Sequence, residues 1–139
     1  MKKKLWLGVL AGILVVIAVF LLVDRMIPKE FEDLCPNMQK PEACRILYAA
    51  ADGSNMITLA GAELEELLSV LEGLDYYKGG SYGSVMEGNI CHLFFSAQGE
   101  EQFTLHVSDA GKVYTQSSYY DFAPGVSPTT LSSYLQTLF

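Results

Sequence analysis

The stretch VMEGNICHLFFSAQGEEQFTLHVS, residues 85–108, decides the fold, because two expected strands, 85–97 and 101–108, flank the short polar pair Gln98-Gly99. Two such runs joined by so short a loop are typical of an antiparallel hairpin. A two-residue loop pairs Ala97 with Glu100, and continuing this register predicts one apolar face. Its expected pairs are Phe94 with Phe103, His92 with Leu105 and Ile90 with Val107. The reverse face is then half-polar and places Cys91 opposite His106.

More strands are expected on both sides of this hairpin. Residues 112–122 follow the turn at 109–111, and a loop of two or of three residues there would exchange the faces of the last strand. Both alternatives stay open, so the sequence does not decide which of Tyr119 and Tyr120 is buried. Upstream, residues 46–48 and 56–59 form a second hairpin around 52–55, a group rich in turn-forming residues.

Two helices are expected to cover the sheet. The first has glutamates at 63, 65 and 66 in its first turns and stops at Gly73, and its leucines recur at i, i+3, i+4 and i+7 at Leu64, Leu67, Leu68 and Leu71. The second starts with Ser127 as N-cap and Pro128 at the first position, and its core positions are Leu131, Tyr134, Leu135 and Leu138. The predicted order is ββαβββα, an α+β domain with an antiparallel sheet and helices on one face.

The segment before this domain predicts a membrane anchor. Residues 5–23 carry no charge and would be about 28 Å long as a helix, close to the thickness of a bilayer core. Lysines fill positions 2–4, whereas only Arg25 and Lys29 lie just after the run, which predicts a cytoplasmic N-terminus. A cleaved signal peptide is the alternative, although no small-x-small site ends the run. The expected division is a cytoplasmic end (1–4), a spanning helix (5–23), a juxtamembrane linker (24–44) and an extracytoplasmic domain (45–139).

The charge of the domain argues against nucleic acid as a partner. All 16 acidic residues follow Val23, but only six of the nine basic residues do. A surface with this balance repels phosphate backbones and anionic lipids. We therefore expect contact with the membrane through residues 5–23 alone.

The cysteines agree with export. Cys35 and Cys44 bound a polar, proline-punctuated stretch that is too short to build its own core, and a disulfide between them would stabilise it by about 2–3 kcal/mol. Two free thiols in a reducing compartment are the alternative. Cys91 is left over and is expected to pack as a small apolar residue.

Motifs for catalysis, cofactors and metals are mostly missing from the sequence. Residues 79–83 match G-x-S-x-G, but they follow a helix and precede a strand, so Ser81 lacks the strand–turn–helix context of a nucleophile. His92 and His106 are the only histidines, too few for a histidine-rich metal site. The expected juxtaposition of Cys91 and His106 leaves a thiol activated by a base as an alternative. We expect no cofactor and no metal.

One loop has the composition of a recognition surface. Residues 75–84 combine Tyr76, Tyr77 and Tyr82 with glycine and serine. Tyrosine supplies a large contact area at low entropic cost, and small residues let a loop adapt. These three tyrosines are the candidate binding residues. The alternative is that Tyr76 or Tyr77 caps the core after the helix.

The sequence of segments from about residue 45 to 139, including DAGKVY at 109–114 and SYYDF at 118–122, resembles small membrane-anchored extracytoplasmic proteins of Gram-positive bacteria. Those proteins have no characterised activity, so the resemblance implies no catalytic residue. We expect a membrane-anchored binding or accessory domain, whose role includes inhibition of a partner or protection of the cell. The alternative is a small thiol-dependent enzyme or redox protein that uses Cys91 and His106.

Overall fold

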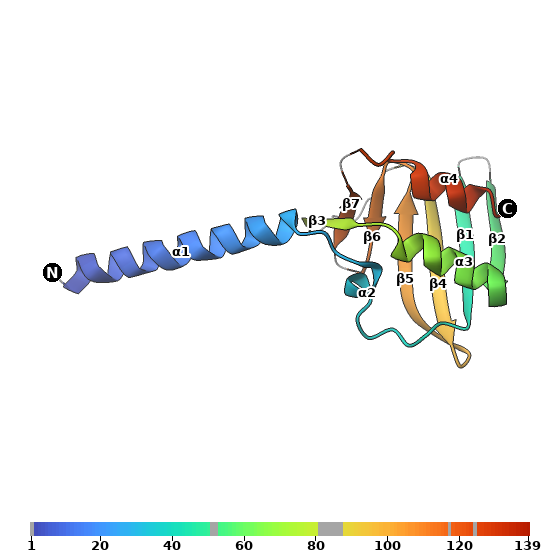
Figure 1. The fold of residues 1–139 in the computed structure, drawn as a ribbon, viewed down its shortest axis with the longest axis horizontal. Helices are drawn as coiled ribbons and strands as arrows, with labels where there is room; N and C mark the ends of the chain where they lie inside the picture. Colours follow the sequence, from blue (N-terminus) through green and yellow to red (C-terminus); the bar gives the residue numbers. More distant parts are fainter. Residues whose placement is uncertain (1, 51–52, 81–87, 117, 124) are drawn as a thin grey trace.

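The structure of the protein is a computed structural model. It describes residues 2–50, 53–80, 88–116, 118–123 and 125–139. Helix α1 (Lys2–Met26) extends away from the domain formed by the rest of the chain (Figure 1). It is long and apolar enough to cross a membrane, and none of its residues is buried against the domain. The α+β fold with an N-terminal membrane-type helix is confirmed.

The domain is built on one antiparallel sheet of seven strands in the order β2-β1-β4-β5-β6-β7-β3. The strands are β1 (Ala43–Ala50), β2 (Gly53–Ala60), β3 (Tyr76–Gly80), β4 (Ile90–Ala97), β5 (Glu100–Ser108), β6 (Lys112–Tyr114) and β7 (Tyr119–Phe122). Strands β2 and β3 form the two edges, and helix α1 joins the sheet at the β3 edge (Figure 1).

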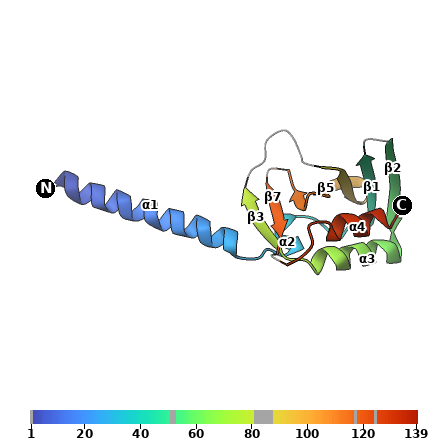
Figure 2. The same cartoon turned by 90° about the horizontal axis from the view of Figure 1, so that it is seen from above.

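Helices α2 (Phe31–Leu34), α3 (Gly61–Glu72) and α4 (Thr130–Gln136) lie on the same face of the sheet (Figure 2). The predicted stripe of α3 is confirmed, because Leu64, Leu67 and Leu71 are buried in the core. Helix α4 begins later than expected, after the N-cap Thr129. The Thr130 N–H is already bonded to the Ser127 carbonyl at 3.1 Å, so Ser127-Pro128 forms a turn that precedes the helix.

The predicted register of the central hairpin is right at its loop and wrong beyond it. Ala97 lies opposite Glu100 and Ser96 opposite Glu101, as predicted, but a β-bulge then pairs Phe95 with Phe103. One extra residue on β5 shifts the pairing by one position. For the rest of the hairpin, each β4 residue therefore shares a face with the β5 residues that were expected on the opposite face. The core face therefore carries Cys91, Leu93 and Phe95 on β4, and Phe103, Leu105 and Val107 on β5. The bulge lets both strands bury their most apolar set.

The predicted last strand, residues 112–122, is a hairpin of two short strands, β6 and β7. The Thr115 N–H donates to the Ser118 carbonyl at 2.8 Å and closes the turn between them. The turn before β6 has three residues, because Val107 lies opposite Val113, and Gly111 adopts a φ of +91° there. In this arrangement Tyr120 packs against the core and Tyr119 lies on the opposite face, and both remain half-buried.

The stretch expected as a juxtamembrane linker contributes to the domain. Phe31, Leu34 and Cys35 are buried in the core. The Lys29 and Tyr76 backbones exchange two hydrogen bonds, at 2.6 and 2.9 Å, which ties the chain after α1 to strand β3. Helix α1 is thus connected to the sheet edge within a few residues.

The expected disulfide is wrong, because all three cysteines are free and buried. Cys44 faces the core from β1, and Cys35 follows α2 and donates its thiol hydrogen to the Phe31 carbonyl at 3.3 Å. Both pack as small apolar residues in the shared core, so this packing holds the ends of the segment between them without a disulfide. Burial raises the pKa of the Cys35 thiol to about 11 and that of Cys44 to about 12. Cys91 is free and buried, as expected.

Candidate functional site

The three tyrosines of the predicted recognition loop do not form one surface. Residues 76–80 are strand β3, so Tyr76 and Tyr77 point to opposite faces of the sheet. Tyr76 is fully buried, and its hydroxyl donates to the Leu71 carbonyl at 2.7 Å. Tyr77 is half-buried, opposite Asp121. Tyr82 lies outside the described residues and stays a prediction.

Strand β3 was not predicted from the sequence, because it ends in two glycines, a residue that is uncommon in strands. Gly79 lies under the aromatic ring of Tyr119, and a Cβ at position 79 would overlap that ring. A glycine in a strand is typical of such a close approach. Gly79 therefore makes room for a neighbouring aromatic side chain within a strand, in place of the loop we expected.

The prediction that Cys91 lies opposite His106 is wrong, because the β-bulge between β4 and β5 shifts the pairing of the two strands by one residue. Cys91 lies opposite Val107 on the core face, whereas His106 lies opposite His92 on the other face. Burial raises the pKa of the Cys91 thiol to about 11, further from a reactive thiolate. The structure thus separates the two residues of the proposed thiol site.

The face of the sheet that points away from α3 and α4, which we call the outer face, carries a line of side chains that crosses five strands. This cross-sheet row consists of Leu47, His92, His106, Tyr114 and Tyr119, each directly opposite the next. Met56 of the edge strand β2 lies opposite Leu47 and extends the row. Only the corrected register reveals it, because the expected one placed the two histidines on different faces.

The centre of the row is a histidine pair. The Nδ1 atoms of His92 and His106 are 2.6 Å apart, and the ring planes are 80° from parallel. One Nδ1 must donate and the other must accept, so the neutral pair holds one hydrogen between the rings. Burial lowers the pKa of both histidines, and the charge of His92 lowers that of His106 further.

Cations on aromatic rings flank the row. The Arg45 guanidinium lies 4.9 Å from the centre of the Phe94 ring and pairs with Glu101 at 2.8 Å. The Lys112 ammonium lies 4.9 Å from the centre of the Tyr119 ring. A pocket of about 410 Å³ opens next to His106, lined also by Glu101, Gln102, Phe103, Thr104 and Gln116. The outer face thus combines aromatic area with charged and polar groups, as protein-binding surfaces do.

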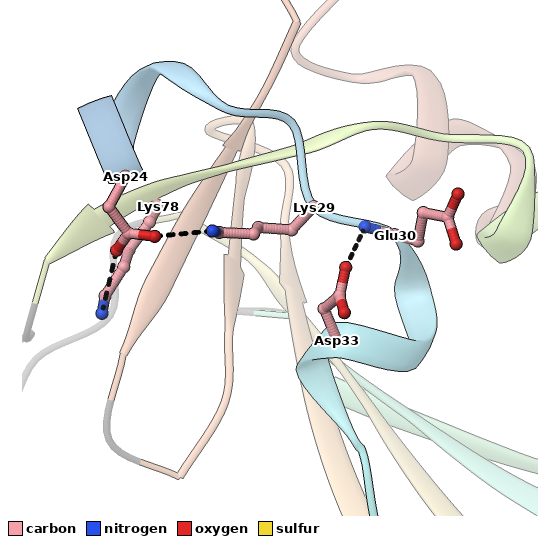
Figure 3. Close-up of polar contacts among 5 residues, drawn as sticks. All are labelled: Asp24, Lys29, Glu30, Asp33 and Lys78. Atoms are coloured by element: carbon pink, nitrogen blue, oxygen red, sulfur yellow. Dashed lines mark hydrogen bonds and ion pairs between the residues drawn. The ribbon is translucent and has the colours of Figure 1, made fainter. Parts of the chain in front are cut away.

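A second polar cluster joins α1 to the sheet (Figure 3). The Asp24 carboxylate accepts a hydrogen bond from the Lys29 ammonium at 2.6 Å and pairs with Lys78 of β3 at 3.7 Å. A few residues on, the Asp33 carboxylate accepts from the Glu30 N–H at 2.9 Å and caps α2. With the Lys29–Tyr76 backbone pair, these contacts hold the end of α1 against β3.

Neither cluster forms a metal centre in the described ranges, where no three histidine, cysteine or acidic side chains gather around one point. The two histidines of the outer face supply two ligands, fewer than the three or four that zinc takes from proteins. No protein-family model, no curated protein and no solved structure matches this chain. The function therefore has to be argued from the geometry of the domain.

The histidine pair predicts acid sensitivity. Both folded-state pKa values are lowered, so the unfolded chain binds protons first as the pH falls below about 6.5, and stability decreases. The other charged groups near this face are Arg45, Glu101 and Lys112. We expect the melting temperature to fall between about pH 7.5 and 5.5.

The variant H92Q/H106Q should show a smaller fall over the same pH range. The difference between the two proteins isolates the histidines, because all other groups are common to both. An equal fall in both proteins would contradict the prediction.

Proposed function

We propose that this chain is a single-pass membrane protein whose C-terminal domain lies outside the cytoplasmic membrane and binds a protein partner with the outer face of its sheet. The observation that carries the proposal is the short connection between α1 and β3. Two contacts hold it, the backbone pair of Lys29 with Tyr76 and the ion pair of Asp24 with Lys78. A domain fixed at the end of an apolar helix is held at the membrane surface in a restricted orientation. Such a placement suits a tethered binding or accessory domain.

The orientation rests on the basic residues that flank the helix. Lys2, Lys3 and Lys4 precede the apolar run 5–23 of this helix, whereas only Arg25 and Lys29 lie just after it, and Lys29 is paired with Asp24. Positive residues are retained on the cytoplasmic side of a spanning helix. This supports a cytoplasmic N-terminus and an exported domain.

The choice of a protein as partner rests on the cross-sheet row. Tyr114 is buried, but the other members of the row are partly exposed, and Met56 beside them is exposed. Tyrosine presents an apolar body with a polar tip and is enriched at protein interfaces, as is methionine. The acidic balance of the chain disfavours nucleic acid. Inhibition of the bound partner is one way in which such a domain would protect the cell. The thiol alternative draws no support from a Cys91 that is buried on the core face.

The topology is tested with reporter fusions to the full chain, after residue 30 and after residue 139. An export-dependent reporter should be active at both positions, and a reporter that works only in the cytoplasm should be inactive at both. Activity of the cytoplasmic reporter would overturn the proposed orientation. A soluble mature protein that starts near residue 24 would overturn the anchor.

The binding surface is tested by site-specific photo-crosslinking in the native membrane. A photoreactive residue in place of Tyr119, on the outer face, should form a crosslink to one partner protein. The matched control replaces Glu72, which is exposed at the last residue of α3, at the end of the helix far from β2. Replacing Tyr119 by alanine should weaken binding of that partner by about 2 kcal/mol, as for a hot-spot tyrosine. Crosslinks from position 72 alone would place the surface on the helical face instead.

A further inference from the structure

The two edges of the sheet are built differently. Strand β3 is five residues long, has a bulge between Lys78 and Gly80, carries the charge of Lys78 and is partly covered by the bridge from Lys29. Short length, bulges, lysine and covering segments are the devices by which proteins prevent other strands from adding to an edge. The β3 edge is therefore closed.

Among the residues that the structure describes, strand β2 has none of these devices. It is eight residues long, GSNMITLA, with no charged residue and no proline. Its pairing with β1 is regular along its whole length, from Ala43 opposite Ala60 to Ala50 opposite Gly53. Its Met56 side chain is 59% exposed, unusual for a large apolar residue of the sheet. The described part of the chain places no strand beyond β2.

An edge strand of this kind has backbone hydrogen-bonding groups that face away from the sheet. Every second residue of β2 presents its backbone N–H and C=O away from β1, and these groups pair best with another extended backbone. Docking of an extended peptide onto a free edge is a common mode of recognition, in which main-chain hydrogen bonds supply affinity and side chains supply specificity. The chemistry of the β2 edge thus points to an extended polypeptide as ligand.

The position of α1 excludes one possible occupant. Helix α1 leaves the sheet at the β3 edge, and β2 lies at the far end of the domain (Figures 1 and 2). Antiparallel pairing of two β2 strands would relate two copies by a half-turn and point their α1 helices in opposite directions. Two copies anchored in one membrane cannot meet in this way, so the occupant comes from a different protein.

We propose that β2 is a docking edge for an uncharged, extended segment of the partner, flanked by basic residues. The basic flank follows from α3, which begins directly after β2 and exposes Glu63, Glu65 and Glu66. A residue of the added strand would lie beside Met56 and continue the cross-sheet row. The inference rests on the proposed function and assigns its partner a strand that completes the sheet.

The test uses the full chain in lipid nanodiscs and the fluorescent synthetic peptide KTVTVTVK as probe. The peptide should bind and slow hydrogen exchange in β2. Two N-methylated forms, one blocking the odd and the other the even backbone N–H groups, should behave differently, because an added strand uses only one set. One form should lose about tenfold or more in affinity and the other should keep most of it.

The variant S54K/T58K places two lysines at exposed positions of β2 and should weaken peptide binding by about tenfold. The matched control N37K adds a lysine at an exposed position next to Gln102 and Phe103 of β5 and should bind the peptide like the original chain. Unchanged circular dichroism shows that both variants fold.

Equal losses for the two N-methylated peptides, or no change in exchange at β2, would overturn the docking edge. Peptide binding that N37K weakens as much as S54K/T58K does would overturn it too, as would a dimer of the full chain that S54K/T58K alone dissociates. None of these results depends on the reporter fusions. Failure of the docking edge is therefore distinct from failure of the proposed topology.

Discussion

Replacing Leu14 and Val15 together by arginine should release the protein from the membrane. Both residues lie near the middle of α1, and their side chains are exposed, so no part of the domain would shield the new charges. An arginine at the centre of a spanning helix costs about 2.5–3.5 kcal/mol on insertion scales, so two cost about 5–7 kcal/mol. The measurement is the fraction of full chain that resists alkaline carbonate extraction.

The matched control for this variant is M26R, which adds an arginine beside Arg25 at the last residue of α1. A charge at this position can stay at the interface, so M26R should remain in the membrane fraction. The melting temperature of the domain should not change in either variant, because α1 buries none of its residues. A double variant that stays fully integrated would contradict a spanning role for α1.

The features that the sequence predicted well depend on residues close together in the chain. The leucines of α3 repeat within three turns, so their common face follows from helix geometry without knowledge of the partner. The apolar run of α1 is likewise a property of one uninterrupted segment. The Gln98-Gly99 loop belongs to the same class, because the residues that set it are neighbours.

The features that the sequence did not predict depend on residues far apart or on a single inserted residue. Strand β3 exists because Tyr76 pairs with Phe122 of β7 and with Lys29, neither of which is local. The bulge at Phe95 leaves no mark in the alternation, because β4 and β5 each keep a regular pattern on either side of it. The register, and with it the histidine pair, could not be read from periodicity alone.

The candidate site shows the same limit. Composition identified a tyrosine-rich segment, but composition does not say which face of a strand each tyrosine occupies. The spacing of Cys35 and Cys44 fitted a small disulfide loop, yet Phe31 and Leu34 pack the first cysteine into the main core. In both cases tertiary packing decided what the local sequence left open.

Replacing Tyr76 by alanine should cost about 3–5 kcal/mol of stability, as for other large aromatic side chains removed from a core. Tyr76 is fully buried, its ring lies 6.1 Å from that of Phe122, and its hydroxyl satisfies the Leu71 carbonyl near the end of α3. A loss of this size is comparable with the whole stability of many small domains. We expect a large fraction of Y76A to be unfolded at 37 °C, measured by chemical denaturation of the full chain in detergent.

Two further variants separate the causes of that loss. Y76F keeps the ring and removes only the hydroxyl, so it should cost about 1–2 kcal/mol, the loss expected for one buried hydrogen bond. Y77A is the matched neighbour on the outer face, and truncating this half-buried side chain should cost about 1 kcal/mol. The order Y76A, then Y76F, then Y77A follows from the alternation of strand β3. If Y77A destabilised the domain as much as Y76A, the two side chains would not lie on opposite faces, and β3 could not carry Tyr77 beside the cross-sheet row.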